Sequence, residues 1–209
     1  MKKTLLLSLL VAASTIVTAR ADTITMLSAG PNGGGEILVH DSTDGSYFRT
    51  FCLEKLVSSS LGVAYDANAS GMTQNSHIPL NQGTAWLFRQ FTQGTLPGYD
   101  HSPAAQASLQ NEIWYLMGLQ LPTPDNTYGF DSLAQANGGT GAYNPFTAGP
   151  DAVYVVNVYD LGTMNSDGIG IGDHQDLLWT APVPDGGLTV ALLGLGLTGI
   201  GAISRRVRK

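Results

Sequence analysis

Hydrophobic residues follow three patterns along this chain. Largely apolar runs stand near both ends, at residues 5–17 and 188–203. Between these runs, apolar residues either alternate with polar ones or recur every three to four positions. Alternation is typical of a strand with one buried face, and the longer spacing is typical of a helix packed on a core. The pattern therefore separates two terminal segments from one folded body.

Five stretches of the body have the composition of strands, namely residues 36–40, 46–53, 61–66, 152–159 and 175–180. The stretch 152–159 has the strongest signal, because β-branched valine fills four of its positions. Residues 41–45 read Asp-Ser-Thr-Asp-Gly, which predicts a turn between antiparallel strands. Residues 30–35, 68–78 and 121–149 are rich in turn-forming residues and predict irregular loops.

Two helices are predicted between the third and fourth strands. The first begins with Asn81 as its N-cap and ends at Gly94, a residue suited to the left-handed position after a helix. The second begins with Ser102 as N-cap and Pro103 at the first helical position, and it runs to about Gly118. The fold class we expect is α+β, an antiparallel β framework with two inserted helices.

The N-terminal apolar run has the surroundings of a secretory signal. Lys2 and Lys3 precede it, and Ala19 and Ala21 place small residues where a signal peptidase cuts. We therefore assign residues 1–21 to a signal peptide and expect the mature chain to begin at Asp22. A buried N-terminal helix is the alternative.

The C-terminal apolar run lies between a short motif and a basic tip. The motif is Val183-Pro184-Asp185-Gly186-Gly187, and the tip contains Arg205, Arg206, Arg208 and Lys209. Cations beside a hydrophobic segment stay on the cytoplasmic side, which leaves the body of the protein outside.

This order of motif, apolar segment and basic tip resembles the PEP-CTERM class of sorting signals. Asp185 stands where glutamate is usual and Gly186 replaces a proline, so the motif is closer to the VPDSG variant. The resemblance makes residues 183–209 a sorting signal with a membrane helix. It implies an exported cell-envelope protein, anchored in the membrane at least transiently and processed by an exosortase-type enzyme. A plain tail anchor is the alternative.

The body between the two terminal segments is acidic. All sixteen Asp and Glu residues lie between positions 22 and 187, against only three cations, Arg49, Lys55 and Arg89. Such a charge balance repels phosphate backbones, so we expect no nucleic-acid partner.

Cys52 is the one cysteine of the chain. A thiol in an exported protein meets an oxidising compartment. Cys52 is therefore buried and inert, paired between chains, or committed to a specific reaction.

Two short motifs favour a specific reaction. They are Phe51-Cys52-Leu53-Glu54 at the end of a predicted strand and Gln110-Asn111-Glu112-Ile113-Trp114 in the second predicted helix. Their order and spacing resemble the Cys–Gln thioester domains of bacterial surface adhesins. The resemblance implies that residues 22–182 contain an internal Cys52–Gln110 thioester. Such a bond acylates an amine, here on a surface protein or a polysaccharide, in a self-catalysed reaction with no enzyme activity or cofactor.

Three further residues take supporting roles in this interpretation. Trp114 lies one helical turn after Gln110, where it could cover the bond. Glu54 could accept or return protons. Glu112 stands where the family has alanine, and we expect it to place a charge beside the reacting pair.

Two other functions remain open. One is a non-enzymatic structural or matrix protein with a buried, unreacted cysteine, and the other is a Cys-dependent hydrolase or transferase. We expect no metal, because the four histidines have no ligand spacing. Residues 165–173 combine oxygen ligands and glycines as a calcium loop does, but we favour a glycine-rich turn, since the EF-hand pattern is incomplete.

Overall fold

The computed structural model describes residues 22–31, 34–119 and 123–180. The predicted signal peptide and the predicted sorting tail lie outside these residues. Within them, no helix combines the length and the apolar character that crossing a membrane requires.

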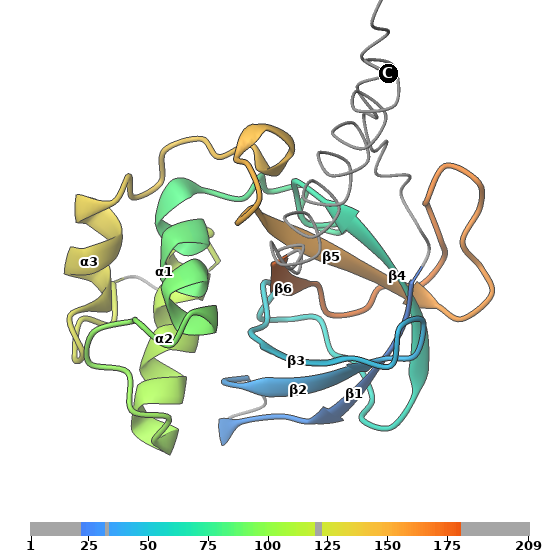
Figure 1. Ribbon diagram of the computed structural model, residues 1–209, viewed down its shortest axis with the longest axis horizontal. Helices are drawn as coiled ribbons and strands as arrows, with labels where there is room; N and C mark the ends of the chain where they lie inside the picture. The colour runs from blue at the N-terminus through green and yellow to red at the C-terminus, as the bar shows by residue number, and fades with distance from the viewer. Residues whose placement is uncertain (1–21, 32–33, 120–122, 181–209) are drawn as a thin grey trace, which may run out of the picture.

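Six strands form one antiparallel sheet in the order β3-β2-β1-β4-β5-β6. The strands are β1 Asp22–Ser28, β2 Ile37–Asp41, β3 Tyr47–Thr50, β4 Ala64–Ser70, β5 Val153–Asp160 and β6 Leu177–Thr180. The sheet curls until the residues after β3 reach β6 (Figure 1). Cys52 pairs with Leu177 there, and the Leu53 amide donates to the Asp176 carbonyl at 2.9 Å. This contact closes the sheet into a small barrel.

The alternation of side chains divides the core into two parts. One buried cluster fills the barrel and contains Ile24, Met26, Ile37, Val39, Cys52, Tyr65, Ala67, Trp114, Val156, Val158 and Leu177. The second cluster lies outside the barrel, where strand residues such as Phe51 and Val155 meet the helices. The Cys52 side chain therefore belongs to the barrel interior, and its neighbour Phe51 belongs to the helical layer.

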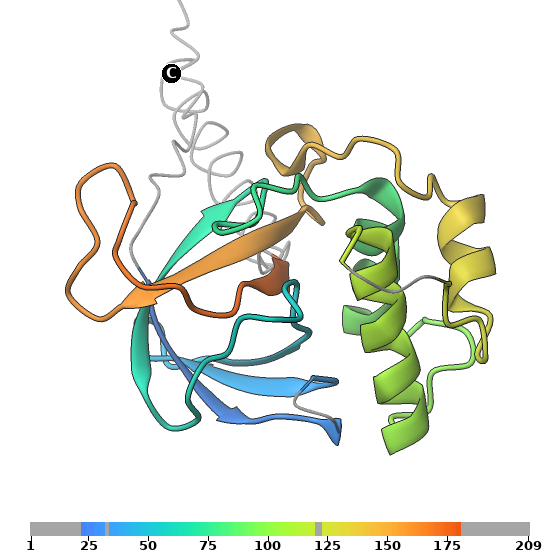
Figure 2. The ribbon, with the colours of Figure 1, turned by 180° about the vertical axis from the view of Figure 1, so that it is seen from behind.

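Three helices gather on one side of the barrel, with α3 outermost (Figures 1 and 2). They are α1 Gln82–Thr92, α2 Pro103–Leu116 and α3 Phe130–Ala136. The predicted caps are confirmed: Asn81 accepts from the Thr84 amide at 2.8 Å, and Ser102 accepts from the Ala105 amide at 3.2 Å. Gly94 has the expected left-handed backbone, with φ of 66°.

The α+β class is confirmed, but several elements differ from the sequence prediction. Helix α3 and a 3-10 turn at Pro145–Thr147 lie in the stretch 121–149, which we predicted to be irregular. Helix α3 has seven residues and no side-chain cap, so it lacks both signals that identify a helix in a sequence. Strand β1 was missed, and β4 begins and ends later than predicted.

Strand β3 ends at Thr50 instead of continuing to Leu53. Residues 51–53 leave the partner strand β2 and pair with β6 instead. At Cys52 the chain after β3 therefore no longer pairs with β2 and pairs with β6 instead.

Candidate functional site

The side-chain amide of Gln110 lies against the backbone of Cys52. Its Oε1 accepts from the Cys52 amide at 3.0 Å and from the Gly35 amide at 3.2 Å. Its Nε2 donates to the Cys52 carbonyl at 2.8 Å. Both side chains are buried, with exposed fractions of 2% for Gln110 and 3% for Cys52. The structure thus brings together the two residues of the predicted thioester.

Strand pairing explains why Gln110 fits at this position. The last pair between β2 and β3 joins Ile37 to Thr50, so in the same register Gly35 and Cys52 would form the pair two positions further on. Because the chain after β3 turns toward β6, the backbone groups of Gly35 and Cys52 do not pair with each other. The Gln110 carboxamide enters from α2 and binds the backbone groups of both residues.

Gly34 leaves space for this insertion. A Cβ atom at position 34 would lie 2.8 Å from Gln110 Cγ and 3.2 Å from Trp114 Cη2. The first distance is shorter than real Cβ contacts and the second is tighter than most, so the close packing of α2 on this segment favours glycine. Sequence reasoning treated residues 30–35 only as a loop and missed this role of Gly34 and Gly35.

The neighbouring Glu36 fixes the course of this glycine segment. Its buried carboxylate accepts from Tyr99 Oη at 2.7 Å and from Arg49 Nη1 at 2.6 Å, and it also contacts His101 Nδ1. Burial acts to raise the pKa of Glu36, but these hydrogen bonds and charges outweigh it and hold the pKa below the usual value. Glu36 therefore remains an anion that ties the start of β2 to the helical layer.

The Cys52 thiol lies in apolar surroundings. Burial raises the pKa of the thiol to about 12, because the thiolate would lose its hydration. At neutral pH the sulfur therefore carries its proton almost entirely. A free Cys52 has the character of a structural core cysteine rather than that of a reactive catalytic thiol.

A cleft of about 660 Å³ opens beside Cys52. Its lining includes Cys52, Lys55, Ser59, Asn111, Trp114 and Gln175. The Lys55 ammonium lies 5.8 Å from the centroid of the Trp114 ring, within the range of a cation–π contact. Among the residues that the structure describes, none accepts a hydrogen bond from the buried Trp114 Nε1.

Glu54 is held by residues of the loop that follows β4. Its carboxylate accepts from Asn75 Nδ2 at 3.0 Å, from the Ser76 amide at 3.0 Å and from Ser76 Oγ at 2.6 Å. These bonds tie residues 75 and 76 to the end of β3. The proton-transfer role predicted for Glu54 stays a prediction.

The expectation for Glu112 needs correction. Glu112 and Gln110 are two positions apart on α2, so their side chains lie on opposite faces of the helix. Glu112 is fully buried, and its carboxylate lies near Asp131 and Asp125 rather than beside Cys52. Burial first, and the repulsion of these two aspartates second, raise the pKa of Glu112 to about 8. Glu112 is therefore mostly uncharged at neutral pH and lies on the α3 side of α2.

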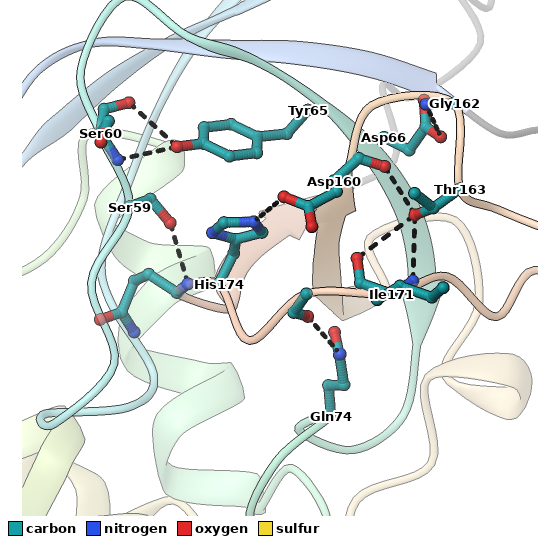
Figure 3. Close-up of polar contacts among 12 residues, drawn as sticks. Ser59, Ser60, Tyr65, Asp66, Gln74, Asp160, Gly162, Thr163, Ile171 and His174 are labelled. Carbon is teal, nitrogen blue, oxygen red and sulfur yellow. Dashed lines mark hydrogen bonds and ion pairs between the residues drawn. The ribbon is translucent and has the colours of Figure 1, made fainter.

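A second polar cluster joins β5 to the segment before β6 (Figure 3). His174 Nε2 lies 2.7 Å from Asp160 Oδ1, and a side chain at Gly172 would collide with both groups. Ser59 Oγ accepts from the Gln175 amide at 2.9 Å. The serine hydroxyl is thus bound to the backbone, and the cluster fastens the hairpin 161–176.

The loop 165–173 is closed by its own residues. Asn165 Oδ1 accepts from the amides of Asp167 and Ile169, at 2.9 and 3.1 Å. Over the described ranges, no three His, Cys, Asp or Glu side chains are grouped so that they could hold a metal ion.

The C-terminal segment was compared with known protein families. Residues 182–207 match the VPDSG-CTERM motif. This match contains the sequence motif Val183 to Gly187, the apolar run, and Arg205 and Arg206 of the basic tip. It indicates a protein that is exported and sorted to the membrane or cell envelope, and a motif of this type is generally processed by an exosortase. Neither the curated proteins nor the solved structures contain a match to the chain.

Proposed function

We propose that the exported domain is a covalent attachment module that forms a thioester between Cys52 and Gln110. The observation that supports it most strongly is the fixed carboxamide of Gln110, which two hydrogen bonds to the Cys52 backbone and one to the Gly35 amide hold in place. Reaction between a weak nucleophile and an amide requires such fixed proximity.

The bond would form by direct displacement. Cys52 Sγ attacks the side-chain carbonyl carbon of Gln110, the S–C bond forms, and the C–N bond to Nε2 breaks. The thiol proton leaves with Nε2 as ammonia. During the attack, negative charge develops on Oε1, which already accepts hydrogen bonds from the Gly35 and Cys52 amides. These two donors act as an oxyanion hole.

The thioester would then acylate an amine. The amine nitrogen attacks the carbonyl carbon of Gln110, an amide bond forms, and Cys52 regains its thiol. Trp114 packs in the same buried cluster as Cys52 and limits the access of water to the bond. The product is a covalent tether between the domain and a neighbouring surface molecule.

The last described strand leads away from the cleft. Strand β6 runs from the cleft, where Gln175 lies, to Thr180 at its far end. Trp179 lies with Asp22 and Asp41 around a small hollow at that far end. Thr180, the last residue that the structure describes, therefore lies at the end of the barrel opposite the cleft.

A structural protein with an unreacted cysteine is the second candidate. It is favoured by the bond from Gln110 Nε2 to the Cys52 carbonyl, which exists only while the amide is intact. The raised pKa of Cys52 also favours an inert thiol. A Cys-dependent hydrolase is less well supported, because no described side chain that could act as a base is hydrogen-bonded to the thiol.

Mass spectrometry of the exported protein distinguishes the two candidates. If the thioester forms, we expect the peptides that contain Cys52 and Gln110 to be linked, with the loss of one ammonia. Methylamine should open the link, add to Gln110 and expose the thiol. The variant Cys52→Ala should keep the full mass. A wild-type protein with the full mass and an alkylatable Cys52 would exclude the attachment mechanism.

Gly34→Ala tests whether bond formation depends on the position of Gln110. The new methyl group would collide with Gln110 Cγ and shift the carboxamide away from Cys52. We expect the bonded fraction, measured from the same peptides, to fall at least tenfold. Gly71→Ala is the matched control, because its nearest neighbour would lie at an ordinary 3.5 Å. Equal bonded fractions in both variants would show that this close packing is irrelevant to the reaction.

A further inference from the structure

The domain contains a single lysine, and this lysine lines the cleft beside Cys52. The chain has lysines at positions 2, 3, 55 and 209, so Lys55 is the only one between the predicted signal peptide and the sorting tail. Its side chain is exposed and lies over Trp114. The only lysine amine of the exported body is thus placed at the site where an acyl group would form.

Gly34 packs against both the Gln110 side chain and the Trp114 ring over which Lys55 lies. A Cβ atom at position 34 would lie within 3.2 Å of each of these two side chains. Gln110 and Trp114 are also one helical turn apart on α2, so their side chains are neighbours. Lys55 follows Cys52 by three residues, and its four-carbon side chain can swing within the cleft.

We propose that Lys55 is an internal acceptor of the Gln110 acyl group, and this inference rests on the proposed thioester. Lys55 Nζ, in its neutral form, attacks the thioester carbonyl carbon. The N–C bond forms, the S–C bond breaks, and the amine proton passes to Cys52 Sγ. The products are a Lys55–Gln110 isopeptide bond and a free Cys52 thiol, so no further reactant is needed.

The transfer would limit the lifetime of the thioester. An external amine must react before Lys55 does, or the domain converts into a cross-linked form that can no longer attach. Lys55 thus sets the period during which the exported protein can react with a partner.

Peptide mapping of the full exported chain separates the two bonded forms. Trypsin cleaves after Arg49, Lys55 and Arg89, so residues 50–55 form one peptide with both Cys52 and Lys55. An isopeptide bond blocks cleavage after Lys55 and leaves Cys52 open to alkylation in denaturant. A thioester permits that cleavage, protects Cys52 and is opened by methylamine.

The matched variant is Lys55→Arg, which keeps a cation over Trp114 but has no nucleophilic amine. We expect aged wild-type protein to be at least half isopeptide-linked, and we expect Lys55→Arg to remain a methylamine-sensitive thioester. Persistent thioester in the wild type, with cleavage after Lys55, would overturn the internal transfer and leave the proposed function intact. Full mass in both proteins would refute the thioester itself, and the transfer with it.

Discussion

In a Cys52→Ala background, Gln110→Ala is expected to lower the free energy of unfolding by about 4 kcal/mol. The substitution leaves three buried backbone groups without partners, namely the amides of Gly35 and Cys52 and the carbonyl of residue 52. Each unsatisfied buried group costs roughly 1–3 kcal/mol. The background variant removes the thiol, so no cross-link contributes to the comparison. Urea denaturation followed by circular dichroism measures the difference.

Gln106→Ala is the matched control for this experiment. Gln106 lies one turn earlier on α2, and its amide donates to the His101 carbonyl at 2.9 Å near the surface. We expect a loss of about 1 kcal/mol or less, because solvent replaces that partner. A loss at Gln110 no larger than the loss at Gln106 would show that the carboxamide does not support the end of β3.

This result would also change how Gln110 is understood. A glutamine inside a helix is usually solvated, but this one replaces the missing strand partner of Gly35 and Cys52. The same bonds that stabilise the barrel end also hold the carbonyl for attack. If a Gln110 variant does not form the thioester, the Cys52→Ala and Gly34→Ala variants are therefore needed as controls. They separate an effect on the reaction from an effect on folding.

Local chemistry made the helix starts predictable from the sequence. Asn81 and Ser102 cap their helices with their own side chains, so the signal lies within a few residues. Strand β1 was missed because its inward residues Ile24 and Met26 give only a short alternation. Helix α3 was missed because Gly129 precedes it with a left-handed backbone in place of a cap.

The site was predictable only in part, because its parts come from distant segments. The motifs identified Cys52 and Gln110 through a family resemblance. The role of Gly35 depends on strand register and on a partner 75 positions away, which no local pattern contains. The environment of Glu112 depends on Asp125 and Asp131, and so on the placement of α3. Lys55 had no signal beyond being one of three cations.

Stability should fall as pH rises from about 5 to about 8.5. Burial raises the pKa of Glu112 from 4.5 to about 8, and it raises the pKa of Asp176 from 3.8 to about 8. At pH values below the ordinary pKa values, both carboxyl groups are protonated in the folded and in the unfolded state, so neither group affects stability. At pH values between the ordinary and the raised pKa, the unfolded chain releases these protons while the folded domain keeps them. Increasing pH therefore favours unfolding. Above about 8 the penalty is complete and constant.

Glu112→Gln isolates one of these two contributions. Neither carboxylate oxygen of Glu112 has a full hydrogen bond within the described residues, and a nearby Asp125 amide only partly offsets the raised pKa. A neutral amide should therefore resemble the protonated acid. We expect the variant to nearly match the wild type near pH 5 and to exceed it by about 4 kcal/mol near pH 9, since about three pKa units separate pH 5 from the raised value and each corresponds to roughly 1.4 kcal/mol.

Asp176→Asn provides the contrasting variant, because the two buried acids differ in their partners. Asp176 accepts from the amides of Gln74 and Val158, one on each oxygen, so an asparagine would direct its own N–H groups at one of these donors. We expect this variant to lose stability already at pH 5, where Glu112→Gln does not. Chemical denaturation at four pH values measures both. If Glu112→Gln keeps the wild-type dependence on pH, the Glu112 carboxylate ionises normally, and its burial between α2 and α3 has no electrostatic cost.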